Sequence, residues 1–168
     1  MFNKISIYTI FLLLIFKKPN FYENMENIVD LRTVEWKNNK VIMIEQTKLP
    51  NELIFVEYDD FNQVANAIKT LIVRGAPAIG VSGAFGLGLA VLQSKAQTKD
   101  QLLSDLENAK NILFATRPTA VNLSWGLEKI MNVAKTGNSV EEIKELVIST
   151  AKKMADEDIE INKSMGKN

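Results

Sequence analysis

Apolar positions in the early part of the chain alternate as they do in β-strands. Two short runs rich in β-branched and aromatic residues flank Asn38-Asn39 between Arg32 and Gln46, and paired asparagines tolerate the positive φ angles of a tight hairpin turn. A third alternating run, Glu52 to Tyr58, follows a turn that contains a proline. The pattern predicts a small antiparallel sheet of three strands over about residues 32–58.

After Asp60 the spacing of apolar residues changes from two to about 3.6, the period of an α-helix. Asp60 is a suitable N-cap for this helix. Its predicted buried face holds Phe61, Val64, Ala65, Ile68 and Leu71. A second, strongly apolar helix is predicted from Pro77 to about Leu92, because proline is well tolerated in the first turn of a helix.

Three further helices follow. The segments Thr98–Gln101 and Ser139–Glu142 have the form of capping boxes, so a helix is predicted to begin at each of them. Another helix is predicted to begin after Pro118 and to end at Gly137, and the last one to reach about Asn162. The inward face of the Thr98 helix comprises Leu102, Leu103, Leu106, Ala109, Ile112 and Leu113. We therefore predict an α+β fold, a small antiparallel β-sheet followed by a helical bundle over about residues 60–163.

The first 24 residues differ from the rest of the chain. Ile5 to Phe16 is a run of twelve apolar or hydroxyl residues, whereas a bilayer-spanning helix needs about twenty. The run has the length of a signal-peptide core, but Lys17-Lys18-Pro19 follows it instead of a small-residue cleavage site. We expect residues 1–24 to lie outside the fold, translation to start at Met25, and residues 25–168 to form one domain. A membrane anchor is the alternative.

Composition narrows the chemistry that is available. The 168 residues include 20 basic and 20 acidic side chains, so the charge balance argues against a nucleic-acid surface. The chain has no cysteine and no histidine, which removes disulfides, thiolate nucleophiles and the commonest general base and metal ligand. Function must therefore rely on carboxylates, lysine, arginine and backbone amides, and we expect no metal or organic cofactor.

Arg74-Gly75-Ala76 stands immediately before the predicted Pro77 helix. The free N–H groups and the positive dipole end of a helix N-terminus favour an anion, and phosphate is the usual one. Gly75 allows a close backbone approach, and Arg74 adds a bidentate donor. This pattern favours a phosphate site, and an ordinary turn with a surface arginine is the alternative.

Four glycines inside the same helix, at positions 80, 83, 86 and 88, invite comparison with a dinucleotide-binding loop. That loop places its glycines between a strand and a helix, not within the helix. Small residues recurring every three or four positions instead predict a helix packed closely against a neighbour.

Arg117 has a setting similar to that of Arg74. It follows an apolar helix end, and Pro118 and Thr119 are predicted to open the next helix, with Thr119 as its cap. Two arginines at two helix N-termini could converge on one phosphorylated ligand. Asn122 and Trp125 lie one turn further on and are interpreted as packing residues.

Four segments appear in the order that they have in a known family: "LRTVEW", "VRGAPAIG", "ATRPTAVNLSWGLEKI" and "EDIEINKSMG". From Ile28 onward the chain resembles the N-terminal part of the methylthioribose-1-phosphate isomerase family. That family is related to the regulatory subunits of translation initiation factor 2B and to archaeal ribose-1,5-bisphosphate isomerase. The resemblance implies an aldose–ketose isomerase of methionine salvage, which converts 5-methylthioribose 1-phosphate to 5-methylthioribulose 1-phosphate in the cytoplasm.

The resemblance also implies site residues. Substrate phosphate contacts are expected at Arg74, Gly75, Ala76 and Arg117. The family's catalytic cysteine and aspartate belong to a Rossmann-like C-terminal domain, beyond the end of this chain, so we expect the chain alone to be inactive and to expose apolar surface where that domain docks. Homodimers are expected for the full-length family, and no nucleic acid or membrane partner.

The late carboxylates, Asp156, Glu157, Asp158 and Glu160, are interpreted as a solvated helix face or a domain interface, without an acid–base role. A non-catalytic module that senses sugar phosphates or nucleotides, related to the initiation factor 2B subunits, is the alternative function.

Overall fold

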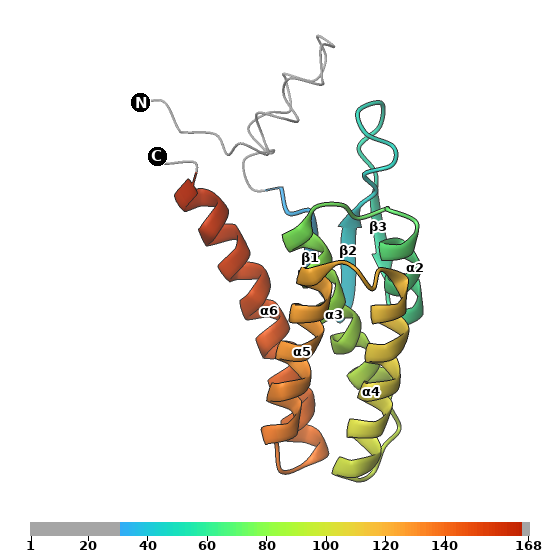
Figure 1. The fold of residues 1–168 in the computed structure, drawn as a ribbon, viewed down its shortest axis with the longest axis vertical. Helices are drawn as coiled ribbons and strands as arrows, with labels where there is room; N and C mark the ends of the chain where they lie inside the picture. Colours follow the sequence, from blue (N-terminus) through green and yellow to red (C-terminus); the bar gives the residue numbers. More distant parts are fainter. Residues whose placement is uncertain (1–30, 166–168) are drawn as a thin grey trace.

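The computed structural model describes residues 31–165, which form a mostly helical α+β fold, as predicted (Figure 1). The strands are β1 (Val34–Lys37), β2 (Lys40–Ile44) and β3 (Phe55–Tyr58), and the helices are α2 (Phe61–Lys69), α3 (Ala76–Gln93), α4 (Lys99–Thr116), α5 (Val121–Thr136) and α6 (Val140–Met165). The predicted extension at residues 1–24 and the start at Met25 lie outside the described residues.

The sheet is antiparallel in the order β1-β2-β3, with β2 in the middle. Asn38 and Asn39 have φ angles of 52° and 59°, which confirms the predicted hairpin turn. Val41 and Met43 of β2 are fully buried, and the ring of Trp36 on β1 lies 5.6 Å from that of Phe85 on α3. The sheet is therefore a layer packed on one side of the helical bundle.

Helix α3 is the core of the bundle. Every residue from Ile79 to Val91 is buried, and the helix packs against α2, α4, α5, α6 and the sheet. Among the described residues, α3 alone is long and apolar enough to cross a membrane, but 72% of it is buried inside the protein. Its apolar character is that of a central core helix, covered on all sides.

The glycines of α3 are packing residues, as predicted. A Cβ atom on Gly83 would lie 2.6 Å from Leu123 of α5, and one on Gly88 would lie 2.9 Å from the Trp36 ring. The closest approach is between the backbones of α3 and α5, where Gly80 faces Gly126. At this point in their second turns, the backbones of the two helices meet without an intervening side chain.

Two residues predicted to be inward are exposed. Leu71 follows the end of α2, has a φ of 62° and is 39% exposed, because Thr70 already ends the helix and the chain turns away from the α2 face. Ile112 is 45% exposed, because the buried stripe of α4 passes through Leu102, Leu106, Ala109 and Leu113 instead. Helical periodicity alone did not identify the limit of each apolar face.

The helix ends differ in how they are capped. Asp60 forms a complete capping box with Gln63 at α2. At α4 and α6 the caps Thr98 and Ser139 accept from the N–H of the third helical residue, as predicted. The return bond of a capping box is shifted by one residue. The Gln101 side chain accepts from the N–H of Gln97, and the Glu142 side chain accepts from that of Asn138, so each partner lies one residue before its cap. Helices α3 and α5 have no side-chain cap.

Candidate anion-binding site

The alternating directions of the helices bring the N-termini of α3 and α5 to one end of the bundle (Figure 1). The segment before α3 and the loop between α4 and α5 both lie at this end. The first contains Arg74 and the second contains Arg117. The two segments that the sequence singled out separately therefore lie at the same end of the fold.

Arg74 is held in a bend at the start of α3. Gly75 is the N-cap residue with a φ of 93°, a conformation that an L side chain rarely adopts, so the bend requires glycine. The N–H groups of Ala76 and Ala78 donate to no protein acceptor among the described residues, and Pro77, the second helical residue, has no N–H to donate. The Arg74 side chain is exposed beside these donors.

The setting of Arg117 differs from the sequence prediction. Pro118 and Thr119 do not open α5 but lie in a tight turn, in which Ala120 N–H donates to the Arg117 carbonyl at 3.0 Å, and the helix begins at Val121. Thr119 is consequently not the cap, since Ala120 occupies that position without a side-chain acceptor. Arg117 is half-buried at the C-terminal end of α4, and its own N–H donates to Phe114 O at 3.2 Å.

The three arginines of the chain form a natural comparison. Arg32 pairs with Asp156 at 2.9 Å. Within residues 31–165, the side chains of Arg74 and Arg117 have neither a carboxylate partner nor a hydrogen-bond acceptor. A guanidinium without a partner next to free helical N–H groups is the arrangement that accepts an anion such as phosphate.

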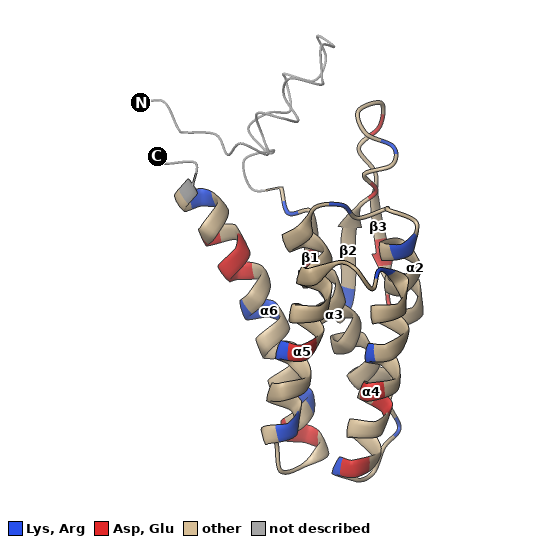
Figure 2. Cartoon of the chain, in the orientation of Figure 1, with Lys and Arg blue, Asp and Glu red and all other residues tan. Residues whose placement is uncertain are grey.

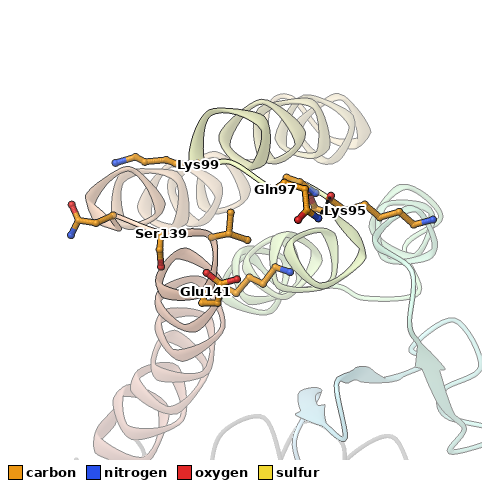
Figure 3. A pocket seen from close by; sticks show the side chains of 10 residues that line it. Lys95, Gln97, Lys99, Ser139 and Glu141 are labelled. Carbon is orange, nitrogen blue, oxygen red and sulfur yellow. Dashed lines mark hydrogen bonds between the residues drawn. The ribbon is translucent and has the colours of Figure 1, made fainter.

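The opposite end of the bundle differs from the end that carries the starts of α3 and α5. There a hollow of about 350 Å³ lies between the α3–α4 and α5–α6 connections, next to the starts of α4 and α6 (Figure 3). Lys95 and Lys99 point away from each other, and Glu141 adds a negative charge. Lys99 also donates to Lys135 O at 3.1 Å. With both helix ends capped by Thr98 and Ser139, this hollow lacks the free donors of the α3–α5 end.

Three of the late carboxylates, Asp156, Glu157 and Glu160, form ion pairs, and α6 carries charges of both signs in Figure 2. Asp156 pairs with Arg32, and Glu157 lies 3.3 Å from Lys129 and 3.8 Å from Lys153. Burial raises the pKa of Asp158, which a hydrogen bond with Asn162 partly offsets. These partners support a structural role for the carboxylates. No group of three or more acidic side chains in the described residues is placed to hold a metal ion, and the absence of a cofactor stays a prediction.

Trp125 is not the packing residue that was predicted. It is 57% exposed on α5, with Lys129 Nζ 5.0 Å above its ring, and Val121 one turn before it is 78% exposed. Asn122 does contribute to packing, since a Cβ on Gly80 would lie 2.8 Å from its carbonyl oxygen. The outer face of the α5 start is therefore apolar and uncovered within the described residues.

Comparison with known proteins identifies the family of the chain. The sequence profile of the initiation factor 2 subunit family matches residues 72–168, more than half of the chain. A methylthioribose-1-phosphate isomerase of Geotalea uraniireducens (strain Rf4) is 42% identical over 142 residues, which cover 83% of this chain and 41% of that protein.

Two solved structures resemble the fold. One is 5-methylthioribose 1-phosphate isomerase from Pyrococcus horikoshii OT3, with a TM-score of 0.77 and 47% identity over 81% of this chain and 39% of that one. The other is translation initiation factor eIF-2B, subunit delta, from A. fulgidus, with a TM-score of 0.74 and 44% identity over 78% of this chain and 38% of that one. The chain spans about two fifths of the length of these relatives. It belongs to the initiation factor 2 subunit family.

Proposed function

We propose that this chain supplies the phosphate-binding part of a methylthioribose-1-phosphate isomerase. The observation that carries the proposal is the pair of uncapped helix N-termini, α3 and α5, each preceded by an arginine without a carboxylate partner in the described residues. The substrate of the named relatives is a sugar phosphate, which is the anion that such an arrangement binds. Arg74, Gly75, Ala76 and Arg117 are the proposed contacts.

The proposed role is binding and orientation. In the substrate the anomeric carbon carries the phosphate, so the sugar ring must open before hydrogen can move between C1 and C2. An acid must assist ring opening, and another group must carry the hydrogen. Asp156, Glu157 and Glu160 form ion pairs, and the chain has neither cysteine nor histidine. We therefore assign the hydrogen transfer to the part of the relatives' length that this chain does not span.

The exposed face of α5 supports a further domain as its neighbour. Val121 and Trp125 are largely exposed beside the arginine end of the bundle, and burying such side chains against a second domain is favourable by about 25 cal/mol per Å² of apolar surface. We propose that the complete protein covers this face, forms a homodimer and acts in the cytoplasm on a small sugar phosphate, without nucleic acid or membrane partners.

A non-catalytic sensing module is the second candidate. The likeness to the A. fulgidus structure, named as an initiation factor subunit, favours it. Such a module would bind a sugar phosphate or nucleotide at the same end of the bundle without converting it.

The deciding experiment measures isomerisation of 5-methylthioribose 1-phosphate by two proteins. One is the 168-residue chain, and the other is a chimera in which the remaining C-terminal length of the P. horikoshii isomerase is joined after α6. We expect activity in the chimera alone. Ligand binding without activity in the chimera would favour the sensing module. Turnover by the chain alone would contradict the assignment of hydrogen transfer to the part of the relatives' length that this chain does not span.

A further inference from the structure

Gln46, in the connection between β2 and β3, makes two hydrogen bonds to the segment that leads into α3. Its backbone N–H donates to Ile72 O at 2.9 Å, and its side-chain Oε1 accepts from the Arg74 N–H at 3.1 Å. One residue thereby fixes both ends of the segment Ile72–Arg74. The sequence offered no signal for this role, because Gln46 lies 28 positions before Arg74.

The segment needs such an anchor because its local conformation is unusual. It is bounded by two residues in the left-handed region, Leu71 with a φ of 62° and Gly75 with a φ of 93°. Between them, Val73 is fully buried, while Arg74 is exposed. Local sequence preferences do not determine a segment with a positive φ angle at both ends, one of them at a leucine, so tertiary contacts must hold it.

The neutral amide side chain of Gln46 suits a position beside an anion site. A glutamine amide oxygen accepts a backbone N–H without a formal charge, whereas a carboxylate in the same place would attract the Arg74 guanidinium and repel a phosphate. The bond to Gln46 also engages the Arg74 N–H, which orients the Val73–Arg74 peptide unit, two residues before the first helical residue of α3.

We propose that Gln46 is a positioning residue for the phosphate ligand, which holds Arg74 and the start of α3 in the orientation that binding requires. This inference rests on the proposed function. Gln46 does not need to touch the ligand, and its effect passes through the backbone of Arg74.

The test uses three variants of the full 168-residue chain. Gln46→Leu removes the acceptor, and Gln46→Glu keeps an acceptor but adds charge. Gln101→Leu is the matched control, since Gln101 Oε1 accepts the Gln97 N–H at 3.0 Å at the opposite end of the bundle. Each protein is titrated with 5-methylthioribose 1-phosphate and with inorganic phosphate, and binding is monitored by the NMR resonances of the backbone amides. Thermal melting measures the stability of each protein.

We expect Gln46→Leu to bind 5-methylthioribose 1-phosphate about three- to tenfold more weakly, the value of one hydrogen bond, and Gln101→Leu to bind it as the wild type does. Gln46→Glu should melt close to the wild type yet bind more weakly, with a deficit that shrinks as salt is added, because salt screens the added charge. That salt dependence reports the added charge, whereas the weaker binding of Gln46→Leu, which adds no charge, reports the lost hydrogen bond to the Arg74 N–H.

Two results would overturn the inference alone: wild-type binding by Gln46→Leu, or equal weakening by Gln46→Leu and Gln101→Leu. Failure of the wild type to bind either ligand would overturn the proposed function, and the role of Gln46 with it.

Discussion

Gly126 of α5 lies directly against the backbone of Gly80 in α3, so that a Cβ atom on Gly126 would stand 2.6 Å from the Gly80 carbonyl oxygen. The contact is also close when viewed from α3, since a Cβ atom on Gly80 would stand 2.8 Å from the backbone carbonyl oxygen of Asn122 in α5. Because both obstacles are backbone atoms, no side chain can move aside. This contact sets the distance between the two helix N-termini at which we propose that phosphate binds.

Gly126→Ala should therefore force α3 and α5 apart. We expect a loss of about 1–3 kcal/mol in the free energy of unfolding, as for other overpacked cores, together with weaker phosphate binding. Urea denaturation measures the first effect and ligand titration the second. Asn132→Ala, at an exposed position of the same helix, should change stability by less than about 0.5 kcal/mol. A Gly126→Ala protein as stable as the wild type would contradict the close crossing.

Removal of either unpaired arginine should weaken binding of 5-methylthioribose 1-phosphate. Arg74→Ala and Arg117→Ala each lose charge-assisted hydrogen bonds, so we expect affinity to fall by about tenfold to a hundredfold in each variant. Lysine at either position should restore only part of it, because lysine lacks the planar fork of arginine. Isothermal titration at fixed ionic strength is the measurement. Arg32→Ala, which breaks the exposed pair with Asp156, should leave the affinity unchanged.

Lys110 links α4 to α5 through Glu128 at 2.6 Å and also pairs with Glu107 at 3.2 Å. The hydrogen bond to Glu128 raises the pKa of Lys110 above its usual 10.5, against the opposing effect of burial. The charged form is thus favoured by folding, so its stabilisation is fully present below the unfolded-state pKa and is lost as pH rises through the folded-state pKa.

Lys110→Gln should therefore be less stable than the wild type at neutral pH. The difference in the free energy of unfolding should be about 1 kcal/mol or less, because both glutamates are half-exposed. This difference in stability, the gap between the two proteins, should close in the alkaline range. Chemical denaturation of both proteins from neutral pH to above the pKa of lysine measures the gap. Lys153→Gln, which removes an exposed pair at 3.8 Å, is the control and should show little difference at any pH. A gap that widened with pH would refute the pKa direction.

Leu71 is a non-glycine residue in the left-handed region, where an L side chain costs roughly 1–2 kcal/mol. Asparagine tolerates this conformation better, so Leu71→Asn should raise the free energy of unfolding by up to about 1 kcal/mol. Leu92→Asn is the matched control, because Leu92 is similarly exposed but helical, and this change should destabilise the protein. Thermal melting compares the two, and a lower melting temperature for Leu71→Asn would count against the strained bend.

The sequence determined what depends on nearby residues. The asparagine pair specified the hairpin because few other residues accept two consecutive positive φ angles. The N-caps at Asp60, Thr98 and Ser139 were identifiable because a cap and the N–H it accepts are three residues apart or fewer. The same local reasoning marked Arg74 and Gly75 as a bend before a helix.

Tertiary structure decided what depends on distant residues. Gly137 ends α5 as predicted, but with an ordinary φ of −68°, and it is glycine because a Cβ would lie 2.7 Å from Ile143 of α6. Ile112 is exposed because no neighbour covers that side of α4 among the described residues. The placement of the Arg74 and Arg117 segments at one end follows from how α3 and α5 pack, and the hydrogen bond between Gln46 and Arg74 follows from how the sheet meets the bundle. Periodicity and capping describe one element at a time, whereas these features arise only when two elements pack together.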